Sequence, residues 1–293
     1  MAATFRAAEV KRYGSFIIAG IVVTLLFLSV SASSQAFGIR AEPSTVLPGD
    51  AFVLKVTGAE ATTVPEGSFD GRRLSFVPCG QGCYFAVGGV DAKSAPGQRP
   101  ATVQIGNISK QLKIRVKRHS FPVIHLTLPP EKVTLSDEDR QRVEKEERRL
   151  KLLWTERSGK AWQGSFRMPL ENEVSTLYGV TRVINKANES IHRGIDVRGK
   201  EGEEVRASNS GTVVLAEELF YGGNTLVLDH GMGIFTVYMH LSRFERAVGD
   251  HVAGGDLIGF VGSTGRSTGP HLHFGVKAQE LSVNPLTFMK LTL

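Results

Sequence analysis

Short apolar runs that alternate with polar residues fill the first part of the chain beyond residue 40. The segment QLKIRVK shows the pattern most clearly, because Leu112, Ile114 and Val116 alternate with lysine and arginine. Such alternation places apolar side chains on one face of a strand and charged side chains on the other. Similar runs are separated by Gly, Pro and Asp. Several short strands at this spacing predict a small immunoglobulin-like β-sandwich over residues 40–130.

The pattern changes to a helical period over residues 131–163, where charged residues are dense. Ser136, followed three residues later by Asp139, is a signal for a helix N-terminus, and neither Gly nor Pro occurs from there until Gly159. The apolar positions form one narrow stripe, which is typical of an amphipathic helix. This segment is therefore predicted to be a helical connector between two β domains. The stripe consists of Val143, Leu150, Leu153 and Trp154.

Residues 164–293 return to short strand-like runs, now divided by glycine-rich turns at hairpin-like intervals. This spacing predicts a second β domain, built from antiparallel strands. The whole chain is therefore expected to be mainly β, with an N-terminal sandwich, a connecting helix and a C-terminal antiparallel domain.

The N-terminus predicts export from the cytoplasm. Arg6, Lys11 and Arg12 form a basic region, followed by an apolar stretch over residues 16–30 and by small residues that suit cleavage after residue 32 or 36. This order is typical of a secretory signal peptide. An uncleaved anchor is the alternative, because a membrane span needs roughly 17 to 25 apolar residues. Residues 1–36 are predicted to be a signal peptide or a membrane anchor.

The charge and the cysteine content limit the kinds of function that the protein can have. The formal net charge of +6 is spread along the chain and forms no basic stripe, so we expect no nucleic-acid partner. A modest positive charge instead suits anionic wall polymers or membrane surfaces. The two cysteines, Cys79 and Cys83, flank a Gly-Gln-Gly segment. In an exported protein this spacing predicts a small disulfide-bonded loop.

The segment GSTGRSTGPHLHFGV, residues 262–276, combines a glycine-rich run with two closely spaced histidines. It is no phosphate-binding P-loop, because Arg266 stands where that motif needs lysine and a strand-like segment follows where the motif needs a helix. On a strand, His271 and His273 would share one face. The pair is then either a surface pair or one wall of a metal site.

Other segments of the last third supply partners for this pair. HRGIDVRG contains His192 and Asp196, whose side chains are ordinary zinc ligands, with Gly194 between them to allow a bend. TVYMHLS places His240 at the end of a predicted strand. The remaining histidines in this region, His230 and His251, occur in glycine-rich contexts and are expected to be turn residues.

Taken together, these motifs resemble the lysostaphin-type, or LytM-type, zinc metallopeptidases, which cut peptide bonds in bacterial cell-wall peptidoglycan. The resemblance rests on H-x-x-x-D, Y-x-H-L and G-x-S-T-G-P-H-L-H-F, in this order, and covers about residues 164–288. It implies that His192, Asp196 and His273 bind Zn²⁺. It also implies that His240 and His271 are the two catalytic histidines that do not bind the metal.

The chemistry of these residue types agrees with that assignment. Three protein ligands leave a fourth zinc position for water, as expected of a catalytic site. A histidine beside that position can act as general base, because its pKa lies near the operating pH.

The resemblance predicts an exported zinc endopeptidase that hydrolyses peptide cross-links of peptidoglycan, in the periplasm or cell envelope. The N-terminal β domain then suits a cell-envelope partner, and residues 16–30 suit membrane anchoring. The alternative is a non-catalytic wall-binding regulator of other peptidoglycan hydrolases.

Overall fold

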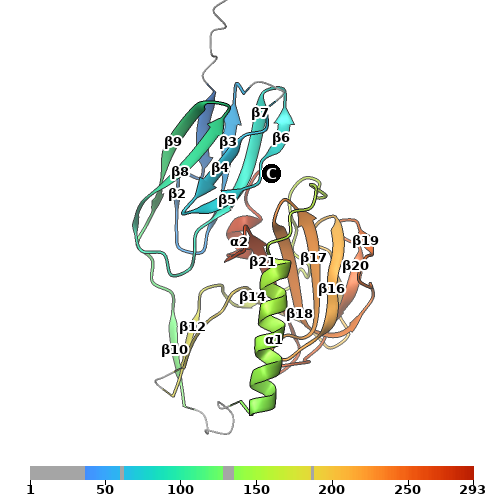
Figure 1. The fold of residues 1–293 in the computed structure, drawn as a ribbon. Helices are drawn as coiled ribbons and strands as arrows, with labels where there is room; N and C mark the ends of the chain where they lie inside the picture. Colours follow the sequence, from blue (N-terminus) through green and yellow to red (C-terminus); the bar gives the residue numbers. More distant parts are fainter. Residues whose placement is uncertain (1–36, 60–62, 128–134, 186–187) are drawn as a thin grey trace, which may run out of the picture. The chain divides into compact units, whose positions relative to one another are not determined.

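The computed structural model describes residues 37–59, 63–127, 135–185 and 188–293. The predicted signal peptide or anchor, residues 1–36, lies outside the described residues and stays a prediction. Of the two helices in the described ranges, neither has the length and apolar character needed to cross a membrane. Strands dominate the described residues (Figure 1), so the prediction of a mainly β protein is confirmed.

Two sheets form the N-terminal β region. The first contains, in order, β1 (Gly38–Glu42), β3 (Ala51–Thr57), β7 (Cys83–Gly89) and β6 (Val77–Gly80). The second contains, in order, β2 (Thr45–Val46), β9 (Ile108–Val116), β8 (Gly97–Ile105), β4 (Glu66–Phe69) and β5 (Arg72–Leu74). Neighbouring strands are antiparallel except β2 and β9, which are parallel.

One apolar core lies between these two sheets. Phe52 of β3 and Phe69 of β4 pack edge to face within it, with ring centroids 4.8 Å apart. The predicted alternation along β9 is confirmed, because Ile114 and Val116 are buried while the cations between and after them are exposed. The predicted disulfide between Cys79 and Cys83 is also present. The immunoglobulin-like description of this region stays a prediction.

A larger antiparallel sheet forms the C-terminal β region. Its main order is β11 (Val174–Thr176), β14 (Ile195–Arg198), β21 (His271–Ala278), β18 (Ile234–Phe244), β17 (Gly223–Gly231), β16 (Gly211–Leu219) and β19 (His251–Val252). β20 (Leu257–Val261) pairs with β18 and with β15 (Glu204–Arg206), and β22 (Leu281–Val283) pairs with β21. The predicted antiparallel arrangement is confirmed.

A small fourth sheet leads into the C-terminal region. β10 (Val123–Leu126) is parallel to β12 (Thr181–Ile184), which is antiparallel to β13 (Asn188–Ile191). β13 ends directly before His192, so this hairpin carries one of the predicted metal ligands. Near the end of the chain, the short helix α2 (Pro285–Phe288) begins after Asn284, whose side chain accepts a hydrogen bond from the nitrogen of Leu286.

The predicted helix is present as α1 (Asp137–Leu153), and it lies along the C-terminal sheet (Figure 1). Its predicted cap is confirmed, because Oγ of Ser136 accepts a hydrogen bond from the nitrogen of Asp139 at 3.0 Å. At the other end, Trp154 packs edge to face on Phe235 of β18, with centroids 5.4 Å apart. Arg149 also forms an ion pair with Glu217 of β16. Helix and sheet are thus joined by both apolar and charged contacts.

Candidate metal centre

Three side chains that are distant in the sequence converge on one point of the C-terminal sheet. His192 follows β13, Asp196 lies in β14 and His273 lies in β21. Nε2 of His192 lies 2.9 Å from Oδ1 of Asp196 and 2.9 Å from Nδ1 of His273. Nδ1 of His273 lies 2.9 Å from the same Oδ1. The three donor atoms therefore form a nearly equilateral triangle.

Strand pairing and one small residue bring these side chains together. β14 pairs with β21 so that Asp196 stands opposite His273. A Cβ on Gly194 would lie 2.5 Å from the carbonyl oxygen of Phe274 and 2.6 Å from Nε2 of His273. The predicted bend at Gly194 is present, because β13 ends and β14 begins on either side of it. The structure adds that glycine is needed there for space.

Hydrogen bonds and burial set the protonation state of the triangle. Nδ1 of His192 lies 2.9 Å from the carbonyl oxygen of Leu177, which can only accept, so Nδ1 donates and Nε2 faces Asp196 and His273. Burial raises the pKa of Asp196, but hydrogen bonds and charge from His192 and His273 outweigh it, so this pKa lies well below its usual range. Burial lowers the pKa of His273. The cluster therefore offers one carboxylate, and its two imidazole nitrogens can ligate a metal once they are deprotonated.

The donor set fits a zinc ion. Zinc binds imidazole nitrogen and carboxylate oxygen at about 2.0 to 2.2 Å in a tetrahedral arrangement, in which ligand atoms are roughly 3.3 to 3.6 Å apart. The 2.9 Å separations between the three donor atoms are slightly shorter, so a small outward shift of each side chain would accommodate the ion.

Two further imidazoles lie beside the triangle. The rings of His240 on β18 and His271 on β21 have centroids 4.7 Å apart. Nδ1 of His240 donates to the carbonyl oxygen of Thr264, and Nδ1 of His271 donates to that of Gly269, each at 2.9 Å. Both histidines therefore leave Nε2 free to exchange a proton. Nε2 of His271 lies 3.8 Å from Oδ1 of Asp196, which directs this nitrogen toward the triangle.

His240 has an unusual backbone conformation. Its φ of 65° lies in the left-handed region, which costs a residue with a Cβ roughly 1 to 2 kcal/mol. Its backbone nitrogen donates to the carbonyl oxygen of Gly222 at 2.8 Å, which holds this conformation in place. Burial lowers the pKa of His240 to about 4, against the opposing effect of the hydrogen bond to Thr264. The imidazole is therefore neutral near pH 7, and it is a weaker base than expected from the sequence, because burial disfavours its protonated form.

The structure corrects the expectation for His230. This histidine was expected in a turn, but it lies within β17 and is fully buried, because the strand continues through the following glycine. Its Nδ1 donates to the carbonyl oxygen of Ser210 at 2.8 Å, and its Nε2 lies 2.7 Å from Oγ1 of Thr236. That hydroxyl bonds the phenol oxygen of Tyr238 at 2.9 Å. His251, by contrast, is exposed at the start of β19.

All five predicted site residues thus lie in one cluster. The groups that orient their rings could not be predicted from the sequence; they are the main-chain carbonyls of Leu177, Thr264 and Gly269. Every residue carries a carbonyl group, so no residue type marks these positions, and only the folded backbone identifies them.

An antiparallel sheet that carries a His–Asp–His cluster beside two free imidazoles defines a metallopeptidase-type domain. Comparison with known families agrees with this class. Residues 190–285 match the family described as Peptidase family M23. The resemblance to the lysostaphin-type metallopeptidases is therefore confirmed.

Individual relatives match the same region. DD-carboxypeptidase/endopeptidase Mpg of Neisseria meningitidis is 45% identical over 97 residues, which are 33% of this chain and 22% of the relative. Lysostaphin of Staphylococcus staphylolyticus is 41% identical over 109 residues, which are 35% of this chain and 23% of the relative. The chain thus covers less than a quarter of the length of these two relatives.

A solved structure extends the likeness to most of the chain. It is a Pseudomonas aeruginosa protein described as a peptidase M23, with a TM-score of 0.65 and 24% sequence identity. The match covers 83% of this chain and 94% of the other. At this identity the likeness shows that the two chains share a fold.

Proposed function

We propose that this protein is an exported zinc-dependent endopeptidase that hydrolyses peptide cross-links of bacterial cell-wall peptidoglycan. The observation that carries the proposal is the complete cluster of two imidazoles and one carboxylate with two further histidines beside it. The match of residues 190–285 to Peptidase family M23, and relatives named as endopeptidases, support the same activity. Action on the cell wall in turn requires a location outside the cytoplasm, in the periplasm or cell envelope.

The five residues have separate roles in this proposal. His192, Asp196 and His273 hold the metal through the three atoms that face one another. Zinc, when bound, supplies Lewis-acid polarisation of a peptide carbonyl and lowers the pKa of water. His240 and His271 then accept and return protons through Nε2, since Nδ1 of each ring is already donated to a carbonyl.

The organisation of the rest of the chain is part of the same proposal. Residues 40–130 form a β domain that contacts a partner in the cell envelope, and residues 164–293 form the peptidase domain. Residues 131–163 connect these two domains. Residues 1–36 act as a signal peptide or as an anchor through residues 16–30.

Digestion of cross-linked sacculi tests the activity. Purified protein should release uncross-linked muropeptides when zinc is retained, and a chelator should abolish the release. The matched control is His251→Ala, which removes an exposed histidine and should leave the activity unchanged. Folded, zinc-loaded protein that changes no muropeptide mass would refute the proposal. If such protein also stimulated another wall hydrolase, the regulator would be the correct function instead.

A further inference from the structure

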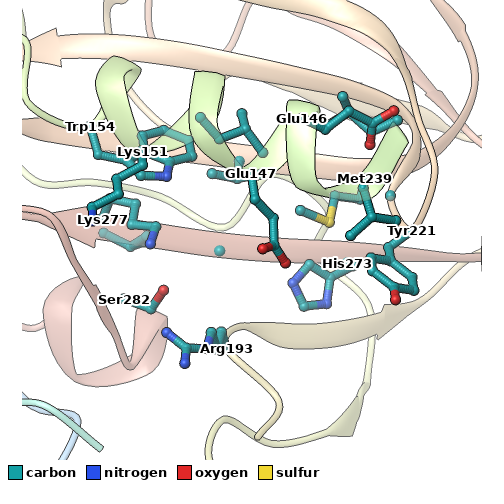
Figure 2. A pocket seen from close by; sticks show the side chains of 17 residues that line it. Glu146, Glu147, Lys151, Trp154, Arg193, Tyr221, Met239, His273, Lys277 and Ser282 are labelled. Carbon is teal, nitrogen blue, oxygen red and sulfur yellow. The ribbon is translucent and has the colours of Figure 1, made fainter. Parts of the chain in front are cut away.

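A pocket of about 420 Å³ lies between α1 and the sheet, and the zinc-ligand candidate His273 is part of its lining. This volume is within the range of small-ligand pockets, roughly 300 to 1,000 Å³. Figure 2 shows Lys277 and Ser282 toward one end of the pocket and His273 and Tyr221 toward the other. The pocket therefore reaches one side of the candidate metal centre at His273, and α1 forms one of its walls.

The floor of the pocket is a strand face suited to an extended chain. Side chains two residues apart on a strand point to the same face, so His273, Gly275 and Lys277 of β21 share it. All three line the pocket. Gly275 adds no side chain between the other two, so the floor is flat there. Lys277 lies roughly 13 Å along the strand from His273, about the length of four extended residues.

The lining of the pocket carries more cationic than acidic side chains. Three cationic residues line the pocket, Lys151, Arg193 and Lys277. Among the described residues, no carboxylate lies within 4.0 Å of any of these three side chains. Of the two acidic residues in the lining, Glu146 is already bonded to Arg142 and to the backbone nitrogen of Phe220. Glu147 is the one remaining carboxylate.

Lys277 is the most constrained of these cations. It is half-buried, and its ammonium group lies 5.1 Å from the ring centroid of Trp154, on the α1 side of the pocket. Burial, together with the charges of Arg193 and Arg72, outweighs the opposing charges of Asp91 and Glu280 and lowers the pKa of Lys277 to about 8. A largely protonated amine in this environment is stabilised by any anion that reaches it.

We infer that this pocket binds an acidic peptide in an extended conformation, with a carboxylate of the peptide held by Lys277 and Arg193. The inference rests on the proposed endopeptidase function and specifies its substrate class. The carboxylate lies about four extended residues from the metal ligands. Lys277 is then a specificity-determining residue, and α1 is a wall of the peptide site.

Binding measurements on the full zinc-loaded chain test this inference without relying on cleavage. The probes are two synthetic five-residue peptides with neutral side chains that differ at the C-terminus only, one ending in a carboxylate and the other in a carboxamide. Isothermal titration gives the dissociation constant of each. The carboxylate peptide should bind about ten- to a hundredfold more tightly, the usual effect of a hydrogen bond to a charged group.

Variants assign the preference to Lys277. Lys277→Met keeps a long apolar side chain against Trp154 and should remove the preference, whereas Lys277→Arg should retain it. Lys290→Met, at an exposed position outside the pocket, is the matched control and should behave like the unmodified protein. Circular dichroism and zinc content should be the same in all four proteins. A lost preference for the carboxylate peptide is then caused by the change in the pocket and not by unfolding or loss of zinc.

Three results would overturn the inference. The first is equal affinity of the unmodified protein for both peptides, and the second is a retained preference in folded Lys277→Met. Absence of binding by either peptide would overturn it as well. The digestion of sacculi tests the proposed endopeptidase function independently of these binding measurements. A carboxylate preference that depends on Lys277, in a protein that cuts no wall, would support the binding site and refute the endopeptidase.

Discussion

Acidification should destabilise the protein through His230. Burial lowers the pKa of this histidine from 6.5 to about 4 in the folded state, whereas the unfolded chain exposes it to water. Between these two pH values His230 binds a proton in the unfolded state but not in the folded state. The stabilisation is therefore complete above pH 6.5, decreases as the pH falls, and is lost by about pH 4. A shift of this size corresponds to a loss of about 3 kcal/mol of folding free energy.

Urea denaturation of the unmodified protein and of His230→Gln, at intervals between pH 7.5 and 4, measures this effect. The glutamine is neutral throughout and retains a donor and an acceptor for the partners of the imidazole. The stability of the unmodified protein relative to the variant should therefore fall by up to about 1.4 kcal/mol per pH unit. Effects of other titrating groups are shared by both proteins and cancel in the difference.

His125→Gln is the matched control, because His125 is exposed on β10. Its stability should follow that of the unmodified protein at every pH. A difference between the unmodified protein and His230→Gln that stays constant from pH 7.5 to 4 would show that His230 is not held neutral by burial, and the reasoning would fail.

Five further substitutions test the site and the helix. His273→Ala removes one of three proposed ligands and should lower both zinc content, measured by elemental analysis, and activity. His271→Ala and His240→Ala should retain zinc while turnover falls by about 10² to 10⁴; loss of zinc from His271→Ala, with retention by His273→Ala, would reverse the assignment. Gly194→Ala forces a Cβ against a backbone oxygen 2.5 Å away, so we expect a lower melting temperature and weaker zinc binding. Ser136→Ala removes the cap of α1 and should cost about 1 kcal/mol in urea denaturation, an effect that a Ser→Thr change at the same position should largely avoid.

Local patterns in the sequence were sufficient to predict several elements of the fold. The alternation along residues 112–116 predicted a strand with one buried face, and Ser136 with Asp139 predicted the start of a helix. Both signals depend on neighbours in the chain, whose geometry is fixed by the repeat of a strand or a helix. The same applies to His271 and His273, which share a strand face because they are two residues apart.

The residue types of the site and the order of its motifs were also present in the sequence, but their arrangement was not. Asp196 and His273 are 77 residues apart, and the register between β14 and β21 places them opposite each other. A strand register is selected by the packing of a whole sheet, so no short segment encodes it. For the same reason only the tertiary structure revealed that His230 is buried, and that the face bearing His273 continues under α1 to Lys277. The sequence thus determined which chemical groups the protein has, and the packing of distant segments decided which of them meet, because contacts between such segments depend on the whole fold.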